Sequence, residues 1–385
     1  MMKHRIWHKP VLRIDEEEKK ERRVTWLELF YDLFFVVIIT QLAHKLVGNI
    51  TFKDIVEYIL LFIPVWWVWI GSTFYNERFE TAGIETRFFY FLKMLSVASI
   101  AIFIHDAIGK DSKFFALSYA AARGIITFLW LRATIHVKAF RKTGTIFVIG
   151  FSLSILLFII SIFIPTPYRF FLWAIGLFID LLTPTFTLSH QAKLPRFSTS
   201  KLPERFGLLI IIVLGESIVG VVNGIAGHHD VSLESVLIGL LGITLVFLLW
   251  WVYFDFVAKR YAKPSPFVGF FWNYLHLPLV LGIAAIGAAI TNTIIHKGPY
   301  WLLPGATGFT LVIIGFLEIT LKQEKKNKKN TIATLLLKIL SGFSIFIIFI
   351  ITGIKNVIIQ YIILIFFILL QVVYDIVINS RLIKK

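Results

Sequence analysis

The sequence predicts an all-α, polytopic integral membrane protein with about twelve transmembrane helices. Its 385 residues are 57% hydrophobic and only 16% charged, whereas soluble domains contain about a quarter charged residues. Apolar runs of about 20 residues recur along the chain, and such runs are too long for barrel strands of about ten residues. This composition excludes a soluble enzyme, and the 38 Phe residues exclude a disordered chain.

Each predicted span is an apolar run bounded by Pro, Gly, Asn or a cluster of charged residues, which interrupt helices. The spans are predicted at residues 24–44, 54–75, 88–105, 114–135, 144–164, 170–189, 205–226, 234–257, 267–293, 300–320, 333–354 and 357–378.

The distribution of Lys and Arg predicts the orientation of these spans. Of the 39 basic residues, 27 fall in connections on the side that holds both termini, and 7 fall on the other side. Under the positive-inside rule, both termini are therefore expected in the cytoplasm, with the protein in the cytoplasmic (plasma) membrane. The N-terminal segment has mixed charge rather than the pattern of a cleaved signal peptide, so the first span is expected to direct membrane insertion.

A polar connection at residues 190–203 is predicted to join two six-helix membrane units, at 24–189 and 204–378. Residues 1–23 form the predicted cytoplasmic N-terminal segment, and residues 379–385 form a basic cytoplasmic C-terminus.

Local matches between the two units indicate a parallel six-plus-six internal repeat. Glu28 aligns with Glu204 at an offset of 176 residues, and the Trp-rich string at Trp66 aligns with that at Trp250 at an offset of 184. An even number of spans in each unit makes such a repeat parallel rather than inverted. The alternative is a set of twelve unrelated helices with recurrent Trp pairs.

Ionisable residues inside the first six spans are candidates for a substrate, proton or ion pathway, because a charge in the bilayer needs a partner or water. Glu28 and Asp32 are spaced i, i+4 and share one helix face, where two carboxylates can share a proton or hold a cation. Lys93, Arg123 and Asp180 lie within other spans, so the two basic residues could neutralise Asp32 and Asp180. Structural pairing of these acids is the alternative.

The second unit offers a deep carboxylate and a deep imidazole. Glu216 has no Lys or Arg near it in the middle of its span, and the adjacent Gly215 and Ser217 would let a helix or a substrate approach closely. His276 is a possible proton relay if it faces Glu216, although a lone His is more often a packing residue.

Two strings in the sequence resemble the bacterial low temperature requirement protein A (LtrA) family. They are WLELFYDLFFV at residues 26–36 and ERFGLLIIIVLGES at residues 204–217. The resemblance extends over nearly the whole chain and implies a multi-spanning cytoplasmic-membrane protein associated by name with growth in the cold. The signature positions that it implies are Trp26, Glu28, Phe30, Asp32, Glu204, Arg205, Gly215, Glu216 and Ser217. No catalytic role comes with them.

The sequence carries no phosphate loop, HExxH or GxSxG motif, and it has no Cys, so we expect no enzyme activity, cofactor or metal site. The triplet His228-His229-Asp230 is too isolated to predict a metal site. The expected partners are the lipid bilayer and a small solute or ion, and no nucleic acid is expected. The sequence also allows a homodimer.

Transport of a small solute or ion, coupled to protons or cations through buried acids, is the predicted function. The alternative is a membrane sensor or an envelope scaffold related to growth at low temperature, and a lipid-modifying enzyme ranks third. Transport predicts a water-accessible cavity that reaches Asp32 and Glu216. A scaffold predicts that every buried acid is paired and dry.

Overall fold

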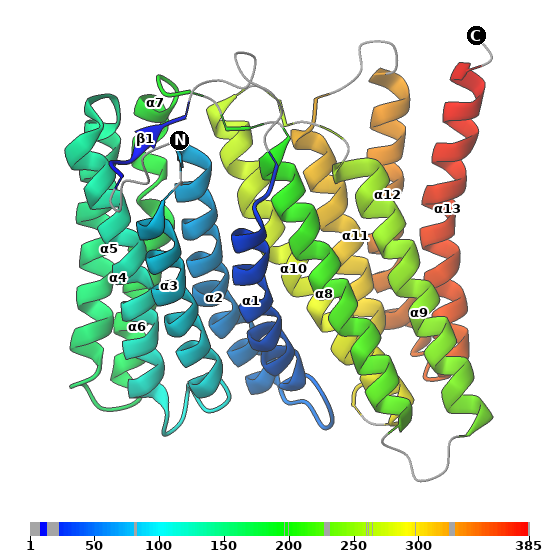
Figure 1. The fold of residues 1–385 in the computed structure, drawn as a ribbon. Helices are drawn as coiled ribbons and strands as arrows, with labels where there is room; N and C mark the ends of the chain where they lie inside the picture. The colour runs from blue at the N-terminus through cyan, green and yellow to red at the C-terminus, as the bar shows by residue number, and fades with distance from the viewer. Residues whose placement is uncertain are drawn as a thin grey trace. The chain divides into compact units, whose positions relative to one another are not determined.

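The computed structural model describes residues 8–13, 23–80, 83–195, 197–198, 200–226, 232–258, 260, 262–263, 265–296, 298–322 and 328–383. Within these residues, twelve helical segments are long and apolar enough to cross a membrane (Figure 1). This confirms the predicted all-α, polytopic membrane fold.

The long helices follow the predicted spans closely. They are α1 (Trp26–His44), α2 (Phe52–Arg78), α3 (Ile84–Phe103), α4 (Ser112–His136), α5 (Arg141–Ser161), α6 (Tyr168–Leu182), α8 (Lys201–Ala226), α9 (Leu233–Tyr253), α10 (Pro266–Ile294), α11 (Leu302–Thr320), α12 (Lys328–Thr352) and α13 (Val357–Ile383).

Shorter elements extend or connect these helices. They are the strands β1 (Val11–Leu12) and β2 (Phe79–Glu80), the 3-10 turns η2 (Lys138–Phe140) and η3 (Thr185–Thr187), the one-turn helix α7 (Leu188–Gln191) and the π-helical turn η4 (Phe254–Ala258). The sixth predicted span is not one continuous helix, because α6 ends just before Pro184, which has no backbone N–H to donate. η3 and α7 then complete a candidate span of Tyr168–Gln191.

The chain divides into two compact units, one of Met1–Leu42 with Ile59–Arg205 (unit 1) and one of Ala43–Tyr58 with Phe206–Lys385 (unit 2). The boundary between Arg205 and Phe206 falls inside α8, so this helix contributes residues to both units. The division does not establish the six-plus-six repeat, which stays a prediction.

In unit 1, the helices α3, α4, α5 and α6 pack in sequence order, each against the next. Aromatic side chains fill the contacts: Trp130 of α4 lies edge-on to Tyr75 of α2 and stacks on Phe140, with centroid separations of 5.3 and 5.4 Å. β1 pairs antiparallel with β2, so that Leu12 lies opposite Phe79. This pairing holds the chain before the first span against the end of α2.

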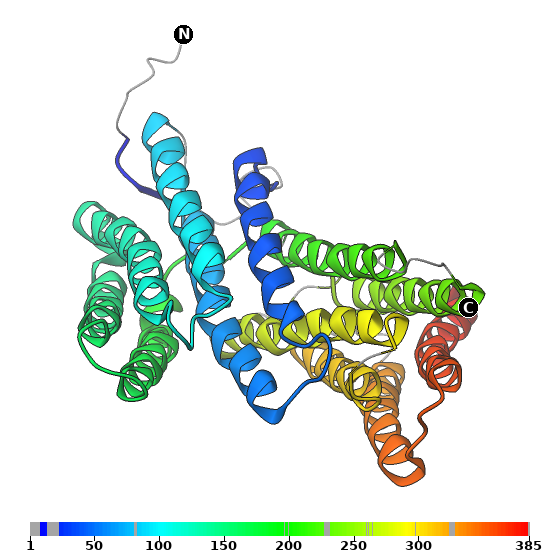
Figure 2. The same cartoon turned by 90° about the horizontal axis from the view of Figure 1, so that it is seen from below.

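In unit 2, α11 packs between α10 and α12, and α9 packs against α13. Figure 2 shows α9 and α13 side by side, although three long helices separate them in the sequence. α11 and α12 approach closely where two glycines meet: a Cβ atom added at Gly308 would lie 2.9 Å from the carbonyl oxygen of Gly342. Such small residues let membrane helices pack backbone to backbone.

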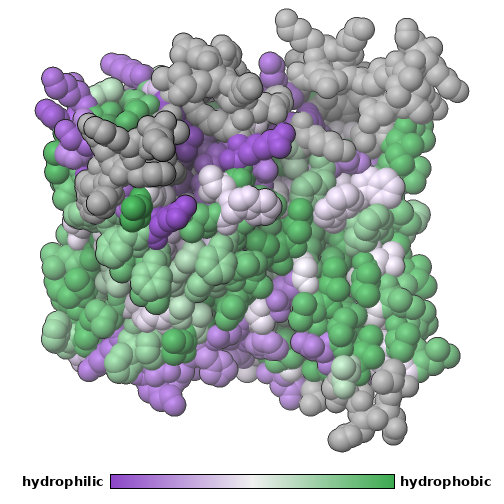
Figure 3. Space-filling view, in the orientation of Figure 1, coloured by the Kyte–Doolittle hydropathy of each residue, from purple (hydrophilic) through white to green (hydrophobic). Residues whose placement is uncertain are grey.

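Apolar side chains cover the outside of the helices, as a lipid environment requires. On the face shown in Figure 3, hydrophobic residues cover the middle of the helices and hydrophilic residues lie mostly toward the helix ends. α1 illustrates the sorting, because Phe30, Leu33 and Val37 are more than half exposed while Glu28 and Asp32 are buried. The two acids of α1 therefore point into the protein.

Candidate functional site

The two acids of α1 lie on its buried face. Glu28 is 1% exposed and Asp32 is 0% exposed, and they share this face with Tyr31, Phe35 and Ile38. The i, i+4 spacing places both carboxylates on one side of the helix. Burial of two such groups requires partners from other helices.

Two basic residues at the start of α8 supply those partners within unit 1. Lys201 Nζ lies 2.8 Å from Glu28 Oε1, and Arg205 Nη2 lies 2.7 Å from Asp32 Oδ1. Arg205 Nη1 also lies 3.6 Å from Glu28 Oε1, and the indole of Trp69 donates to Asp32 Oδ1 at 2.9 Å. Two bases spaced i, i+4 thus face two acids with the same spacing.

Lys93 of α3 adds a third buried cation to this group. Its side chain is 2% exposed, donates to Ser72 Oγ at 2.8 Å, and lies 3.6 Å from the ring centroid of Tyr90. No carboxylate oxygen of a described residue lies within 4.0 Å of Lys93 Nζ. We call Glu28, Asp32, Lys93, Lys201 and Arg205 the Asp32 cluster.

The Asp32 cluster keeps unused hydrogen-bonding capacity. It contains three basic groups and two carboxylates. In the described part of the chain, Asp32 Oδ2 and Arg205 Nε are buried without a hydrogen-bond partner. Buried polar groups normally find a partner or an ordered water. The cluster therefore has an acceptor and a donor available for water, a proton or a solute.

Arg123 and Asp180 form a separate, fuller pair in unit 1. Arg123 donates through Nη2 to Asp180 Oδ1 at 2.9 Å and through Nε to Asp180 Oδ2 at 3.2 Å, and both residues are 0% exposed. The hydroxyl of Tyr119 donates to Asp180 Oδ2 at 2.8 Å. Both carboxylate oxygens of Asp180 accept hydrogen bonds, which is the arrangement expected of an acid that stabilises the helix packing.

Glu216 of α8 belongs to unit 2 and is half-buried. Among the described residues, no hydrogen bond or ion pair is found for its carboxylate. A Cβ atom added at the preceding Gly215 would meet nothing within 4 Å, so there is open space beside it. Ser217 is instead buried and packs against Gly287 of α10.

His276 of α10 is completely buried and packed in an aromatic cage in unit 2. Its Nδ1 lies 2.8 Å from the carbonyl oxygen of Trp272, and its Nε2 lies 3.2 Å from the hydroxyl of Tyr253. The ring of Phe206 lies against the imidazole at a centroid distance of 4.2 Å, with the two ring planes tilted by 38°. Within the described ranges, no interaction joins His276 to Glu216, so the packing interpretation of this residue is favoured.

The remaining signature positions occupy different environments. Trp26 and Phe30 are 87% and 54% exposed on α1, while Arg205 is buried. Glu204 is exposed, and one of its oxygens accepts a hydrogen bond from the backbone N–H of Val24 at 3.1 Å.

Unit 2 has a buried carboxylate that the sequence places at a span boundary. Glu318 of α11 is 2% exposed and is paired with Lys338 of α12 at 3.1 Å and with Arg260 at 2.8 Å. Thr334 donates to the same carboxylate at 3.0 Å. Like Asp180, this acid is held by partners on both oxygens.

No group of three or more His, Cys, Asp or Glu side chains that could hold a metal occurs among the residues that the structure describes. The triplet His228-His229-Asp230 lies outside them.

The fold and the buried charges define a polytopic membrane protein with polar sites inside its helix bundle. The model of the bacterial low temperature requirement A protein (LtrA) family matches residues 23–374, and the chain belongs to this family. An uncharacterized protein of Rhizobium meliloti (strain 1021) is 27% identical over 320 residues, which cover 78% of this chain and 76% of that protein.

Proposed function

We propose that the protein transports a small solute or ion across the membrane, and that the Asp32 cluster is the polar site on its path. The observation that carries this proposal is the incomplete pairing of a fully buried cluster. Each charge at mid-bilayer costs at least about 2.5 kcal/mol unless it is compensated. A cluster with a surplus cation, an unpartnered carboxylate oxygen and an unpartnered guanidinium nitrogen is suited to bind a further polar species.

The comparison with Asp180 supports this assignment. The Asp180 carboxylate is closed on both oxygens by Arg123 and Tyr119. Asp32 lies in the same unit and is equally buried, yet one of its oxygens accepts two donors while the other accepts none from the described residues. A purely structural acid does not require this asymmetry. Asp32 is therefore our candidate for the group that gains and loses a proton during transport.

Proteoliposomes on a solid-supported electrode test the proposal. Concentration jumps of sodium acetate, potassium phosphate and choline chloride should give a protein-dependent current for at least one salt. Asp32→Asn should abolish that current, while Arg87→Gln, a change at an exposed position of α3, should leave it intact. If every salt gives the response of empty liposomes, transport of such ions is contradicted.

A second candidate function is a membrane sensor or envelope scaffold without transport. It is favoured by the complete pairing of Asp180 and Glu318, which is the arrangement expected of charges that only hold helices together. Under this alternative, Asp32→Asn would change the stability of the protein. Neither the parent chain nor the variant would give a transport current.

We further propose that the protein lies in the cytoplasmic membrane with both termini in the cytoplasm, on the basis of its Lys and Arg distribution. Its partners would be the bilayer lipids and the transported species, and a homodimer is compatible with this function. We assign it no catalytic activity, cofactor or nucleic-acid partner.

A further inference from the structure

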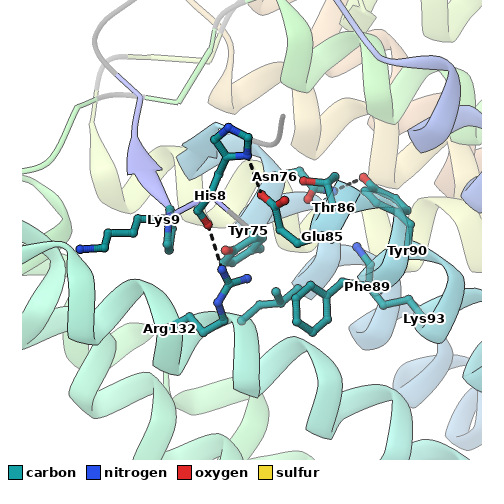
Figure 4. A pocket seen from close by; sticks show the side chains of 12 residues that line it. His8, Lys9, Tyr75, Asn76, Glu85, Thr86, Phe89, Tyr90, Lys93 and Arg132 are labelled. Atoms are coloured by element: carbon teal, nitrogen blue, oxygen red, sulfur yellow. Dashed lines mark hydrogen bonds and ion pairs between the residues drawn. The ribbon is translucent and has the colours of Figure 1, made fainter. Parts of the chain in front are cut away.

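A pocket opens in unit 1 where residues 8–10 cross the ends of α2, α3 and α4 (Figure 4). It is small and partly open: the space that a water-sized molecule can occupy is about 30 Å³. The N-terminal segment is held in place there by the β1–β2 pairing and by Arg132, whose Nη2 donates to the carbonyl oxygen of His8 at 3.0 Å. One wall of the pocket is thus formed by the chain that precedes the first span.

The charges around the pocket are mostly positive. Lys93 and Arg132 line it and are buried, and Lys9 lines it at the exposed rim. The lining contains one carboxylate, that of Glu85, and this group is 3.6 Å from His8 Nδ1. Three basic side chains against one acid leave a net positive lining even when His8 is neutral.

Lys93 carries the strongest argument for a ligand. An ammonium group has three N–H donors, and among the described residues Ser72 accepts one of them at 2.8 Å. The Tyr90 ring faces the same ammonium and supplies a weaker cation–π contact. A buried ammonium with donors to spare, at the edge of a pocket, is suited to an oxyanion.

Neutral donors and an aromatic wall complete the pocket. Asn76 donates to the hydroxyl of Tyr90, and Tyr75 and Phe89 form the apolar part of the lining. Figure 4 shows these side chains with Arg132 and Lys93 around the same space. The pocket therefore combines positive charge with a partly apolar wall, which favours a compact anion.

We propose that this pocket binds a small oxyanion, such as a carboxylate or phosphate group, held chiefly by Lys93 with electrostatic support from Arg132 and Lys9. The inference depends on the geometry of unit 1 and not on the proposed transport. If the protein binds an oxyanion but gives no transport current, only the transport proposal is contradicted. The oxyanion has two possible sources, a free ion or the phosphate of a lipid headgroup. Because Lys93 also belongs to the Asp32 cluster, an anion here would partly offset the surplus positive charge of that cluster.

Isothermal titration calorimetry on the full chain in nanodiscs tests the site. Inorganic phosphate and acetate are titrated as probes, with choline chloride as the comparison, in nanodiscs of phosphatidylcholine alone and of phosphatidylcholine with phosphatidylglycerol. At least one of the two oxyanions should bind, and choline chloride should not. The titrations are made at high ionic strength, which screens the negative surface potential of the anionic lipid. Equal affinity in both lipids then identifies a free ion as the ligand, and weaker binding beside the anionic lipid identifies a headgroup that competes for the same site.

Three variants connect binding to the pocket. Lys93→Met should weaken oxyanion binding about tenfold or more, the loss expected for one charge-assisted hydrogen bond. Lys9→Gln changes an exposed residue, so it should fold normally and weaken binding by a smaller factor. Lys113→Met, at an exposed position of α4 outside the pocket, is the matched control and should bind as the parent chain does.

Two results would overturn the proposal. One is that neither phosphate nor acetate binds in either lipid. The other is that a folded Lys93→Met variant binds the oxyanion as the parent chain does. If Lys93→Met does not fold, unchanged binding in Lys9→Gln overturns the proposal instead.

Discussion

Arg205 Nη2 lies 2.7 Å from Asp32 Oδ1, although the two residues are 173 positions apart in the sequence. Each belongs to one of the two strings that carry the family resemblance, so these strings meet inside unit 1 through an ion pair. Lys201 and Glu28 form a parallel pair one helical turn away. The first residues of α8 are thereby fixed to α1 by charge.

Loss of the Arg205 guanidinium should strongly destabilise the protein. Arg205→Gln leaves Asp32 without its ionic partner, and breaking a buried pair costs about 3–5 kcal/mol in soluble proteins. Thermal or denaturant unfolding in detergent measures the change, with the exposed Arg87→Gln as the control. Equal stability of the two variants would contradict a structural role for the Asp32–Arg205 pair.

The Arg123–Asp180 pair should behave as a closed structural unit. Arg123→Gln and Asp180→Asn should each lower stability, and the double variant should be more stable than the sum of the two losses predicts, because neither charge is then left alone. Unfolding of all four proteins measures the coupling energy. A coupling energy near zero would show that the observed contact does not contribute to stability.

Glu216 should tolerate loss of its charge with little change in stability, because no partner is found for it among the described residues. Glu216→Gln is expected to unfold within about 0.5 kcal/mol of the parent chain, the range typical of changes away from specific contacts. The exposed Glu234→Gln of α9 is a matched control. If Glu216 also lies on the transport path, the electrode current should fall in the first variant and not in the second.

Tyr253→Phe tests the packing interpretation of His276. The change removes the hydroxyl that lies 3.2 Å from His276 Nε2, and one such hydrogen bond contributes about 1 kcal/mol. We expect a stability loss of that order and an unchanged electrode current. A lost current with unchanged stability would instead indicate that His276 relays protons.

Tags report the orientation of the chain. Epitope tags at the N-terminus, at residue 325 and at the C-terminus should all be reached only from the cytoplasmic side, because 27 of the 39 basic residues lie in connections on that side. An external tag at residue 325 would contradict the arrangement of twelve spans with both termini in the cytoplasm.

The helices could be predicted from the sequence because hydropathy alone fixes where a chain can cross a bilayer. The partners of the buried acids could not. Lys93 and Arg123 are closer to Asp32 in the chain than Arg205 is and are plausible partners, yet Asp32 pairs with Arg205. The side chains of α1 and of the start of α8 meet inside unit 1. Pairing depends on which helices meet, and hydropathy carries no information about that.

One signal in the sequence could have identified the pairing. Lys201 and Arg205 have the same i, i+4 spacing as Glu28 and Asp32, and opposite charges in matching registers can face one another across two helices. By hydropathy alone, Lys201 falls in the predicted polar linker of residues 190–203. The pocket has no such signal in the sequence, because the chain at residues 8–12 is held there by the pairing of β1 with β2, which is a tertiary contact.

Water access to the Asp32 cluster tests the central claim most directly. The chain has no Cys, so a single introduced thiol reports without background. Ser72 accepts the hydrogen bond of Lys93, whereas Ser154 is a serine of unit 1 that is buried on α5 away from the cluster. Ser72→Cys and Ser154→Cys are both small changes. A polar path through the Asp32 cluster should reach the thiol at position 72 and should not reach the thiol at position 154.

The two variants are treated in inside-out membrane vesicles with the anionic, membrane-impermeant reagent sulfonatoethyl methanethiosulfonate. A transport path through the cluster predicts that Ser72→Cys is modified and that Ser154→Cys is not. If neither thiol reacts while a Cys at exposed Lys9 does, the Asp32 cluster is dry, and the proposal that it lies on a transport path is contradicted.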